Sequence, residues 1–108
     1  MRIALIPLET QVGDPVANRR HLEERLVEAG RHHPDLVCFP ECTLTGYLYE
    51  EEDLARFAEV LPGPTTQEMG YLARQYGIWL CCGLVEQEGT RFYNTAILLD
   101  RAGRIALR

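Results

Sequence analysis

One carboxylate of this chain stands directly behind a short apolar run and a proline. Residues Leu36 to Phe39 are apolar, Pro40 follows them, and Glu41 comes next. Proline cannot donate to a sheet ladder and fixes its own backbone angle, so a strand would end here and the carboxylate would leave it in a defined direction. The carboxyl ends of strands line the ligand crevice in open α/β sheets, where an acid is well placed for proton transfer. Glu41 is therefore our candidate general base, weighed against the commoner case of a strand-end glutamate that is merely solvated.

The residues after Glu41 could complete a pocket. Gly46 can turn the chain back, and Tyr47 brings an aromatic ring with a hydroxyl group that could line a site for a small molecule. Tyr47 could equally be an ordinary core residue. We treat it as a candidate substrate-binding residue.

Four cysteines lie in two clusters: Cys38, Cys42, Cys81 and Cys82. The vicinal pair should point to opposite faces of a strand. In apolar surroundings such thiols are more often reduced and buried, as small hydrophobic residues, than joined in disulfides. With His32 and His33 they match no common zinc spacing, so we expect no metal site. A redox or metal protein that uses these cysteines is the least favoured alternative.

Two residue types are missing from the sequence. The chain contains no serine, and all eleven residues counted as Lys or Arg are arginines. A serine triad is thereby excluded within these residues, and a mechanism that requires a lysine must obtain it from elsewhere. The formal net charge of -5, without a basic stripe, argues against nucleic acid as a partner. The longest apolar run, Ile78 to Val85, is too short to cross a membrane, so we expect a cytoplasmic protein that does not bind membranes.

The first third of the chain predicts a βαβ unit. Arg2 to Leu8 is nearly all apolar, the pattern of a strand that is covered on both faces. Asp14 and Pro15 would cap and open a helix that runs to about His33, with apolar residues at helical spacing. Leu36 to Phe39 would then form a second strand, parallel to the first.

Two helices and a β-meander should follow. Residues 50–53 are all acidic, which favours a helix N-terminus rather than a metal site. The apolar face of this helix would consist of Leu54, Phe57, Ala58 and Leu61. Thr65 and Glu68 predict a capping box for another helix, which Gly77 would end. Its buried face would consist of Met69, Leu72, Ala73 and Tyr76. Three β-rich runs joined by hairpins complete the chain: Ile78 to Glu86, Arg91 to Asp100 and Arg104 to Leu107. This order predicts an α/β fold with a mixed sheet and helices for one of its faces.

Taken together, these segments resemble one known family. The stretch FPECTLTGY, residues 39–47, closely resembles the first signature of the nitrilase superfamily of carbon–nitrogen hydrolases, and Glu41 matches the position of the family's catalytic glutamate. The opening RIALIPLE, the helix with Asn18, the GLVEQEG run and the FYNTAILLDRAGRI hairpin around Asn94 follow in the family's order. The resemblance implies a nitrilase-like αββα sandwich, of which this chain supplies roughly the first half: the βαβ unit, two helices and the β-meander. Residues 1–108 would be the incomplete N-terminal part of a single carbon–nitrogen hydrolase domain.

The resemblance also implies a reaction. The family hydrolyses amides or nitriles with a Glu, Lys and Cys triad through a thioester; Glu41 would be the general base, and the lysine and cysteine would lie outside these residues. Cys42 adjoins Glu41, but neighbouring side chains of an extended segment diverge, so Cys42 is not expected to be the nucleophile. The expected substrate is an amide or N-carbamoyl amine, and Tyr47 would line its pocket.

The family's architecture has consequences for partners as well. A sandwich needs a second sheet, so we expect association as a homo-oligomer or through an exposed apolar sheet face. No cofactor is expected. The rival interpretations are a non-catalytic nitrilase-like binding or regulatory module and an inactive truncated fragment.

Overall fold

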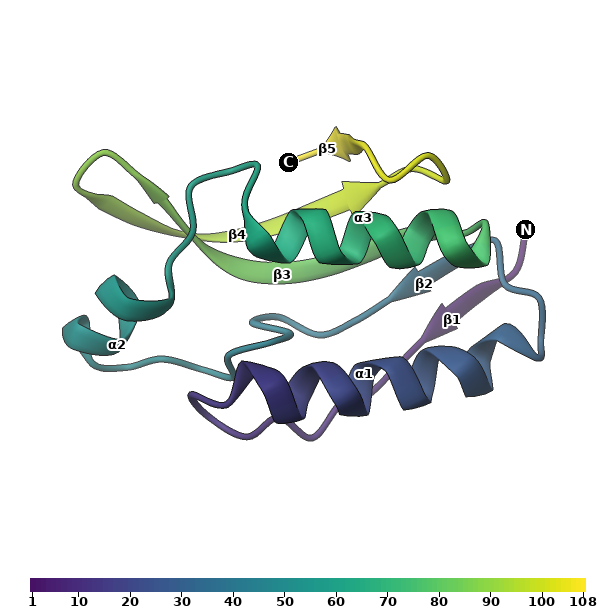
Figure 1. Cartoon of the computed structure of the whole chain (residues 1–108), viewed down its shortest axis with the longest axis horizontal. Helices are drawn as coiled ribbons and strands as arrows, with labels where there is room; N and C mark the ends of the chain where they lie inside the picture. The colour runs from purple at the N-terminus through teal and green to yellow at the C-terminus, as the bar shows by residue number, and fades with distance from the viewer.

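The computed structural model describes residues 1–108 and contains a five-stranded sheet with three helices (Figure 1). In chain order the elements are β1 (Ile3–Leu5), α1 (Pro15–Gly30), β2 (Leu36–Cys38), α2 (Glu51–Phe57), α3 (Pro64–Tyr76), β3 (Trp79–Glu88), β4 (Arg91–Leu99) and β5 (Ile105–Leu107). The strands lie side by side in their sequence order; β1, β2 and β3 are parallel, whereas β4 runs antiparallel to both β3 and β5. The predicted α/β class, the parallel first pair and the closing meander are confirmed.

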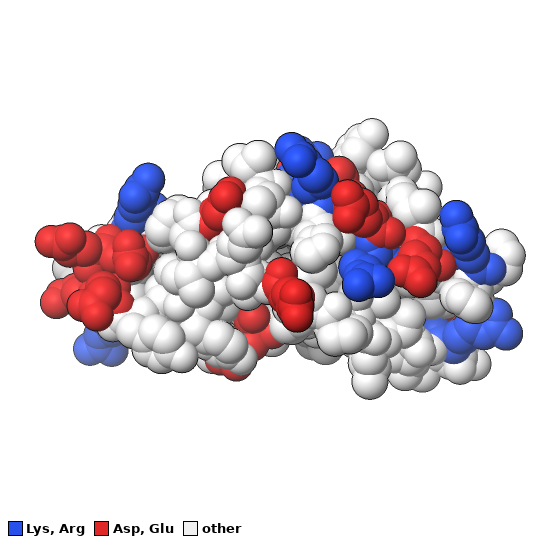
Figure 2. Space-filling view, turned by 90° about the horizontal axis from the view of Figure 1, so that it is seen from below, with Lys and Arg blue, Asp and Glu red and all other residues white.

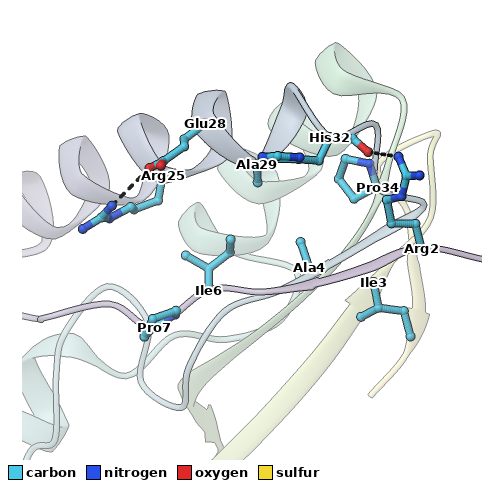
Figure 3. A pocket seen from close by; sticks show the side chains of 10 residues that line it. All are labelled: Arg2, Ile3, Ala4, Ile6, Pro7, Arg25, Glu28, Ala29, His32 and Pro34. Carbon is cyan, nitrogen blue, oxygen red and sulfur yellow. Dashed lines mark hydrogen bonds and ion pairs between the residues drawn. The ribbon is translucent and has the colours of Figure 1, made fainter.

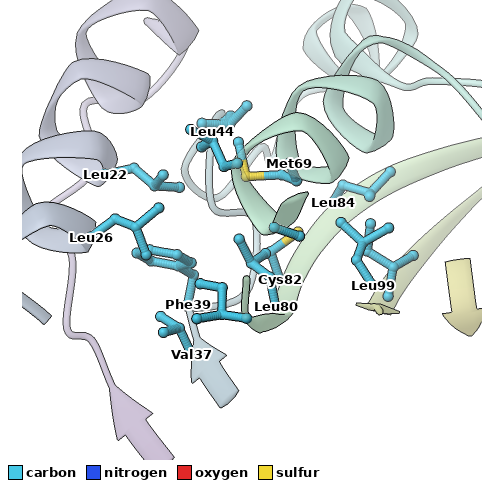
Figure 4. Packing of buried hydrophobic residues seen from close by; sticks show 14 residues of the cluster. Leu22, Leu26, Val37, Phe39, Leu44, Met69, Leu80, Cys82, Leu84 and Leu99 are labelled. Carbon is cyan, nitrogen blue, oxygen red and sulfur yellow. The ribbon is translucent and has the colours of Figure 1, made fainter. Parts of the chain in front are cut away.

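Both long helices cover the same face of the sheet. Leu22 and Leu26 of α1 and Met69 and Leu72 of α3 belong to one buried cluster, into which the helical and strand side chains point together (Figure 4). The sheet contributes Val37, Leu80, Cys82, Leu84, Ile97 and Leu99. Burial of each large aliphatic side chain is worth about 1.5–3 kcal/mol, so this cluster fixes both helices on the sheet.

No part of the chain covers the opposite face of the sheet. One row of paired residues crosses all five strands on that face: Leu5, Cys38, Cys81, Leu98 and Leu107. Leu5 is 75% exposed and Leu107 is 66% exposed. Apolar side chains thus line the uncovered face of the sheet from one edge to the other.

The prediction for the first strand was therefore wrong in two respects. β1 covers Ile3–Leu5 rather than Arg2 to Leu8, because β2 has only three residues to pair with before the chain reaches Pro40. It is also covered on one face only, since α1 lies over one side and Ile3 on the other side is 47% exposed.

The first helix begins where the sequence predicted. Asp14 Oδ1 accepts a hydrogen bond from the N–H of Ala17 at 3.0 Å, and Pro15 is the first helical residue. α1 ends at Gly30 rather than near His33. Pro34 disfavours a helical conformation at the residue before it, which accounts for the earlier end.

The second helix is shorter and less buried than predicted. α2 has no buried residue, and Ala58 already has an extended backbone. The N–H of Glu59 donates to the carbonyl of Val85 at 3.0 Å, and its carbonyl accepts from the N–H of Gln87 at 2.8 Å. Pairing with β3 thus ends the helix before Leu61 can extend its apolar face.

The third helix is capped by residues other than those predicted. α3 starts at Pro64, one residue before the predicted Thr65, and Thr66 Oγ1 accepts from the N–H of Gly63 at 2.8 Å. Glu68 forms an ion pair with Arg19 of α1 instead of closing a capping box. The predicted end at Gly77 is confirmed: this glycine has the left-handed backbone, with φ 64°, that ends many helices.

Acidic side chains gather at the end of the molecule that carries α2 (Figure 2). Glu51, Glu52 and Asp53 occupy the first turn of this helix, where the helix dipole favours negative charge. No helix of the chain combines the length and apolarity required to cross a membrane.

Candidate functional site

The carboxylate of Glu41 is held by side chains from two distant parts of the chain. Asn94 Nδ2 donates to Glu41 Oε1, and Tyr47 Oη donates to Glu41 Oε2 at 3.2 Å. Asn94 lies in β4, 53 residues beyond Glu41. Glu41 therefore has a fixed orientation although its side chain is exposed.

The backbone beneath Glu41 is anchored to β3. The carbonyl of Pro40 accepts from the N–H of Gly83 at 3.3 Å, and the N–H of Thr43 donates to the carbonyl of Gly83 at 3.0 Å. Cys42 has a left-handed backbone, with φ 48°, so the chain turns sharply just after Glu41. A Cβ at Gly83 would lie 2.8 Å from Glu41 Cα, which shows how closely the loop lies on the strand.

A buried asparagine ties the same loop to the first helix. Asn18 in α1 is 1% exposed, and its Nδ2 donates to the carbonyls of Leu44 at 2.8 Å and Gln11 at 2.7 Å. Its Oδ1 accepts from the N–H of Gln11 at 2.7 Å. The loop is thus held from both sides, and a buried amide with all three bonds made is costly to replace.

A hollow of about 230 Å³ opens beside the carboxylate. Its lining is mostly aromatic and aliphatic: Glu41, Cys42, Tyr47, Leu48, Tyr49, Leu54, Val85, Phe92, Tyr93 and Asn94. Apolar walls with a few convergent polar groups are typical of small-molecule sites. Both candidate site residues from the sequence, Glu41 and Tyr47, lie in this hollow.

Tyr47 is not a core residue, because it is 50% exposed. The hydrogen bond to the Glu41 carboxylate, followed by the negative charge of Glu41, raises the pKa of Tyr47 above its ordinary value. Tyr47 therefore remains a protonated donor well above neutral pH. Its hydroxyl group orients the carboxylate while its ring lines the hollow.

The cysteine next to Glu41 is poorly suited to nucleophilic attack. Cys42 is buried, and burial followed by the negative charge of Glu41 raises its pKa. The attacking form of cysteine is the thiolate, which is disfavoured here. The structure thus gives a physical reason for the expectation that Cys42 does not replace the family's nucleophile.

A second hollow, of about 450 Å³, lies between β1 and α1 and shares no lining residue with the first (Figure 3). Ala4 and Ile6 point into it towards the helix, and Arg25 pairs with Glu28 along its rim at 3.1 Å. His32 also lines this hollow, but no group of three His, Cys, Asp or Glu side chains lies close enough to hold a metal ion.

Sequence reasoning named Asn94 only as the centre of the family-like hairpin, without a role in the site, and it did not single out Gly83. Asn94 is an amide within an otherwise β-rich run, and this interruption is the local signal that could have drawn attention to it. Gly83 is a glycine inside a strand, which often marks a close approach of another backbone. Neither signal indicates which distant residue is approached.

Comparison with known proteins identifies the family of this chain. The family model described as carbon-nitrogen hydrolase matches residues 2–108. The chain is 30% identical over 107 residues to a nitrilase from Pyrococcus abyssi, an alignment that covers 97% of this chain and 41% of that protein. It is 36% identical over 109 residues to an (R)-stereoselective amidase from a Pseudomonas species, covering 100% of this chain and 38% of the amidase. The chain thus spans about two-fifths of the length of these relatives.

Solved structures show the same fold. An N-terminal amidase superposes on 99% of this chain with a TM-score of 0.86 at 19% identity, and 27% of that chain is covered. A CN-hydrolase superfamily protein from Xanthomonas campestris superposes on 97% of this chain with a TM-score of 0.83 at 25% identity, and 38% of it is covered. The sheet and helices described above therefore correspond to the N-terminal part of a nitrilase-like fold.

Proposed function

Since this chain belongs to the carbon–nitrogen hydrolase family, we propose that it carries the general base of a hydrolase that cleaves non-peptide carbon–nitrogen bonds. The observation that supports this most is the carboxylate of Glu41, oriented by Asn94 and Tyr47 at the mouth of an apolar hollow. An anchored carboxylate with free lone pairs is what proton abstraction from a thiol or a water requires.

The proposed reaction has two stages. A thiol from outside these 108 residues attacks the carbonyl carbon of an amide while Glu41 takes its proton. Glu41 passes this proton to the nitrogen, the amine leaves, and a thioester and a free carboxylate remain. Water then attacks the thioester while Glu41 accepts a proton from it, which releases the acid and the free thiol. A lysine, which this chain lacks, would stabilise the oxyanion in both stages.

The site residues have distinct roles in this proposal. Glu41 is the catalytic base. Tyr47 lines the substrate pocket and, with Asn94, positions the carboxylate. Residues 1–108 form the N-terminal part of one hydrolase domain, and the rest of that domain would complete the pocket.

An amide or an N-carbamoyl amine is the proposed substrate class. The curated relatives include an amidase and a nitrilase, and the first-named structural neighbour is an amidase. The hollow is small and mainly apolar, which fits a small acyl group better than a charged polymer. We place the protein in the cytoplasm, as a homo-oligomer without a cofactor.

The test uses the full-length protein that contains this chain and a panel of small amides and N-carbamoyl amines. Glu41→Gln should lower kcat by roughly 10²–10⁴-fold, because the base is lost while the shape of the side chain is kept. Glu24→Gln, an exposed change on α1, is the matched control and should leave kcat unchanged. Intact-mass analysis of the unaltered enzyme should show the acyl thioester. Glu41→Gln activity within about threefold of the unaltered enzyme would contradict the proposed role.

The rival is a nitrilase-like module that binds small molecules without turnover. The absence of any lysine among these residues favours it for the 108-residue chain in isolation, which we expect to be inactive. Calorimetric binding of an amide to the full-length protein, without ammonia or amine release over many hours, would favour this module over the hydrolase.

A further inference from the structure

A buried carboxylate outside the candidate site joins β3 to the residue that follows β5. Glu86 is 3% exposed. Its Oε2 accepts a hydrogen bond from Thr95 Oγ1 at 2.7 Å, and its Oε1 lies 2.9 Å from Arg108 Nη2. A carboxylate is rarely buried unless it is paired, so the contact with Arg108 is what allows this one to lie in the interior.

This ion pair lies on the side of the sheet that α1 and α3 cover. Ile97 of β4 belongs to the buried cluster there, and Thr95, two residues before it in the same strand, points to the same side. Leu84 of β3 also belongs to this cluster, and Glu86 follows it by two residues. A second sheet would cover the opposite face, so the pair between Glu86 and Arg108 would keep its place in a complete sandwich.

β5 pairs with only one end of β4, and the rest of that edge has no partner strand in this chain. Leu107 is the register partner of Leu98, near the end of a β4 strand of nine residues. Partners in an antiparallel pair advance in opposite directions, so in the same register Arg108 lies opposite Ile97. The side chain of Arg108 then leaves the sheet on the helix-covered side, which is where it meets Glu86. The ion pair thus favours a strand that continues along β4 in this register.

A strand continued in this way would lead to the candidate site. Asn94 precedes Leu98 by four residues in β4, so both side chains point to the uncovered face. The third residue beyond Arg108 would lie opposite Asn94 and on the same face, because Leu107 lies opposite Leu98. Asn94 holds the carboxylate of Glu41. A lysine at that position of the strand would therefore lie beside the proposed base.

We propose that Glu86 and Arg108 are positioning residues. Their ion pair fixes the register of the strand that continues beyond Arg108 along β4, and in this way it places the lysine of the reaction beside Glu41. The inference rests on the proposed function, which requires such a lysine. Neither residue of the pair touches the substrate, and both act through the strand. Glu88 also faces Arg108, at 3.6 Å, but its side chain is 66% exposed, so it contributes little to the register.

The test uses the full-length protein that contains this chain. Glu86→Gln keeps the shape of the side chain and removes its charge; it should lower kcat by roughly 10–100-fold, because a small displacement of a catalytic group has an effect of this size. KM should change by less than about threefold. Combining Glu86→Gln with Arg108→Gln should lower kcat no further, since both substitutions remove one interaction. Arg108→Lys keeps the charge and should retain most of the activity, and Glu88→Gln is the matched control that should leave kcat unchanged.

Alkylation by iodoacetamide distinguishes this role from a merely structural one. The reagent reacts with a thiolate and forms no tetrahedral oxyanion, so its rate at the nucleophilic cysteine reports on the base and not on oxyanion stabilisation. Glu86→Gln should keep this rate within about threefold, whereas Glu41→Gln should lower it. An unchanged kcat in Glu86→Gln, or an equal loss of kcat and alkylation rate, would overturn the positioning role. Failure of the proposed function would be seen separately, as a Glu41→Gln enzyme with unaltered kcat and alkylation rate.

Discussion

The carboxylate of Glu41 accepts one hydrogen bond on each oxygen, from an amide and from a phenol. A carboxylate offers about four lone-pair positions, so two remain for the proton that catalysis would deliver. Neither donor carries a charge. Asn94 and Tyr47 therefore fix the direction of the base without forming an ion pair that would oppose its protonation.

The hydrogen bond between Tyr47 and Glu41 has a measurable consequence. Because the negative carboxylate raises the pKa of Tyr47, Glu41→Gln should lower that pKa towards the ordinary value of about 10. Ultraviolet absorbance titration of tyrosinate measures it. Tyr47→Phe is introduced into the unaltered chain and into Glu41→Gln, and each is titrated in the same way. Subtracting its curve from that of the matching chain leaves the titration of Tyr47 alone.

Glu24→Gln is again the control, because this exposed carboxylate lies on α1, away from the hollow. It should leave the titration of Tyr47 unchanged. If Glu41→Gln also left it unchanged, the two side chains would not be in contact in solution.

The place of Glu41 at a strand end could be predicted from the sequence, because an apolar strand and Pro40 come directly before it. The residues that hold its side chain could not be predicted in the same way. Asn94 is one amide in a strand, and its contact with Glu41 depends on a register in which β4 reaches the loop after β2 across β3. Such long-range pairing follows from packing rather than from local sequence.

Among the secondary structure elements, β3 carries most of the site. Its first half pairs with β2, its middle holds the loop after Glu41 through Gly83, and its far end receives Glu59. One strand thus aligns three segments that are distant in sequence. The glycine allows the backbone of the loop to lie directly on the strand.

Gly83→Ala should displace this loop. The new Cβ would lie 2.8 Å from Glu41 Cα and 3.0 Å from the backbone nitrogen of Cys42, and backbone atoms cannot rotate away. Overpacking of this kind costs about 1–3 kcal/mol of unfolding free energy, to be measured by urea denaturation. The pKa of Tyr47 should fall as well, because Glu41 moves with the loop.

The matched control is Gly30→Ala at the end of α1. There the new Cβ would meet only the ring of Tyr76 at 3.8 Å, an ordinary contact. Its stability should be unchanged or slightly higher, because alanine favours a helix over glycine by about 1 kcal/mol. Equal stability of the two variants would show that the loop does not lie against β3.

The ends of the helices could be predicted from the sequence wherever a local signal fixes them. Asp14 with Pro15 opened α1, and Gly77 ended α3, because caps act within one turn. The end of α2 did not follow, since Glu59 leaves the helix to pair with β3. The start of α3 was also misplaced, because the N–H of Thr65 donates to the carboxylate of Glu59 at 2.6 Å instead.

The two faces of the whole molecule differ sharply. One is covered by α1 and α3 over a continuous core (Figure 1). The other presents an open row of apolar side chains. The sequence predicted helices for one face only, but not how much of β1 would be exposed. A strand that is apolar on both faces indicates that both faces are buried in the complete fold. It does not indicate which part of a protein buries the second face.

The 108-residue chain should therefore associate through this open face. Large exposed apolar patches on folded proteins mark surfaces that bind a partner, so sedimentation velocity should show a concentration-dependent shift from monomer to larger species. Leu98→Glu places a charge in the middle of the row, and burying an unpaired charge is costly. The variant should weaken association at least about tenfold, equivalent to about 1.4 kcal/mol.

Val27→Glu provides the same charge on the outer side of α1, where Val27 is 49% exposed. It should associate as the unaltered chain does, because that side of the helix faces away from the sheet. A monodisperse monomer at all concentrations, or equal weakening by both substitutions, would show that the open face does not mediate association. In that case the apolar row would be stable in water without a partner, and the need for a second sheet would lose its physical basis.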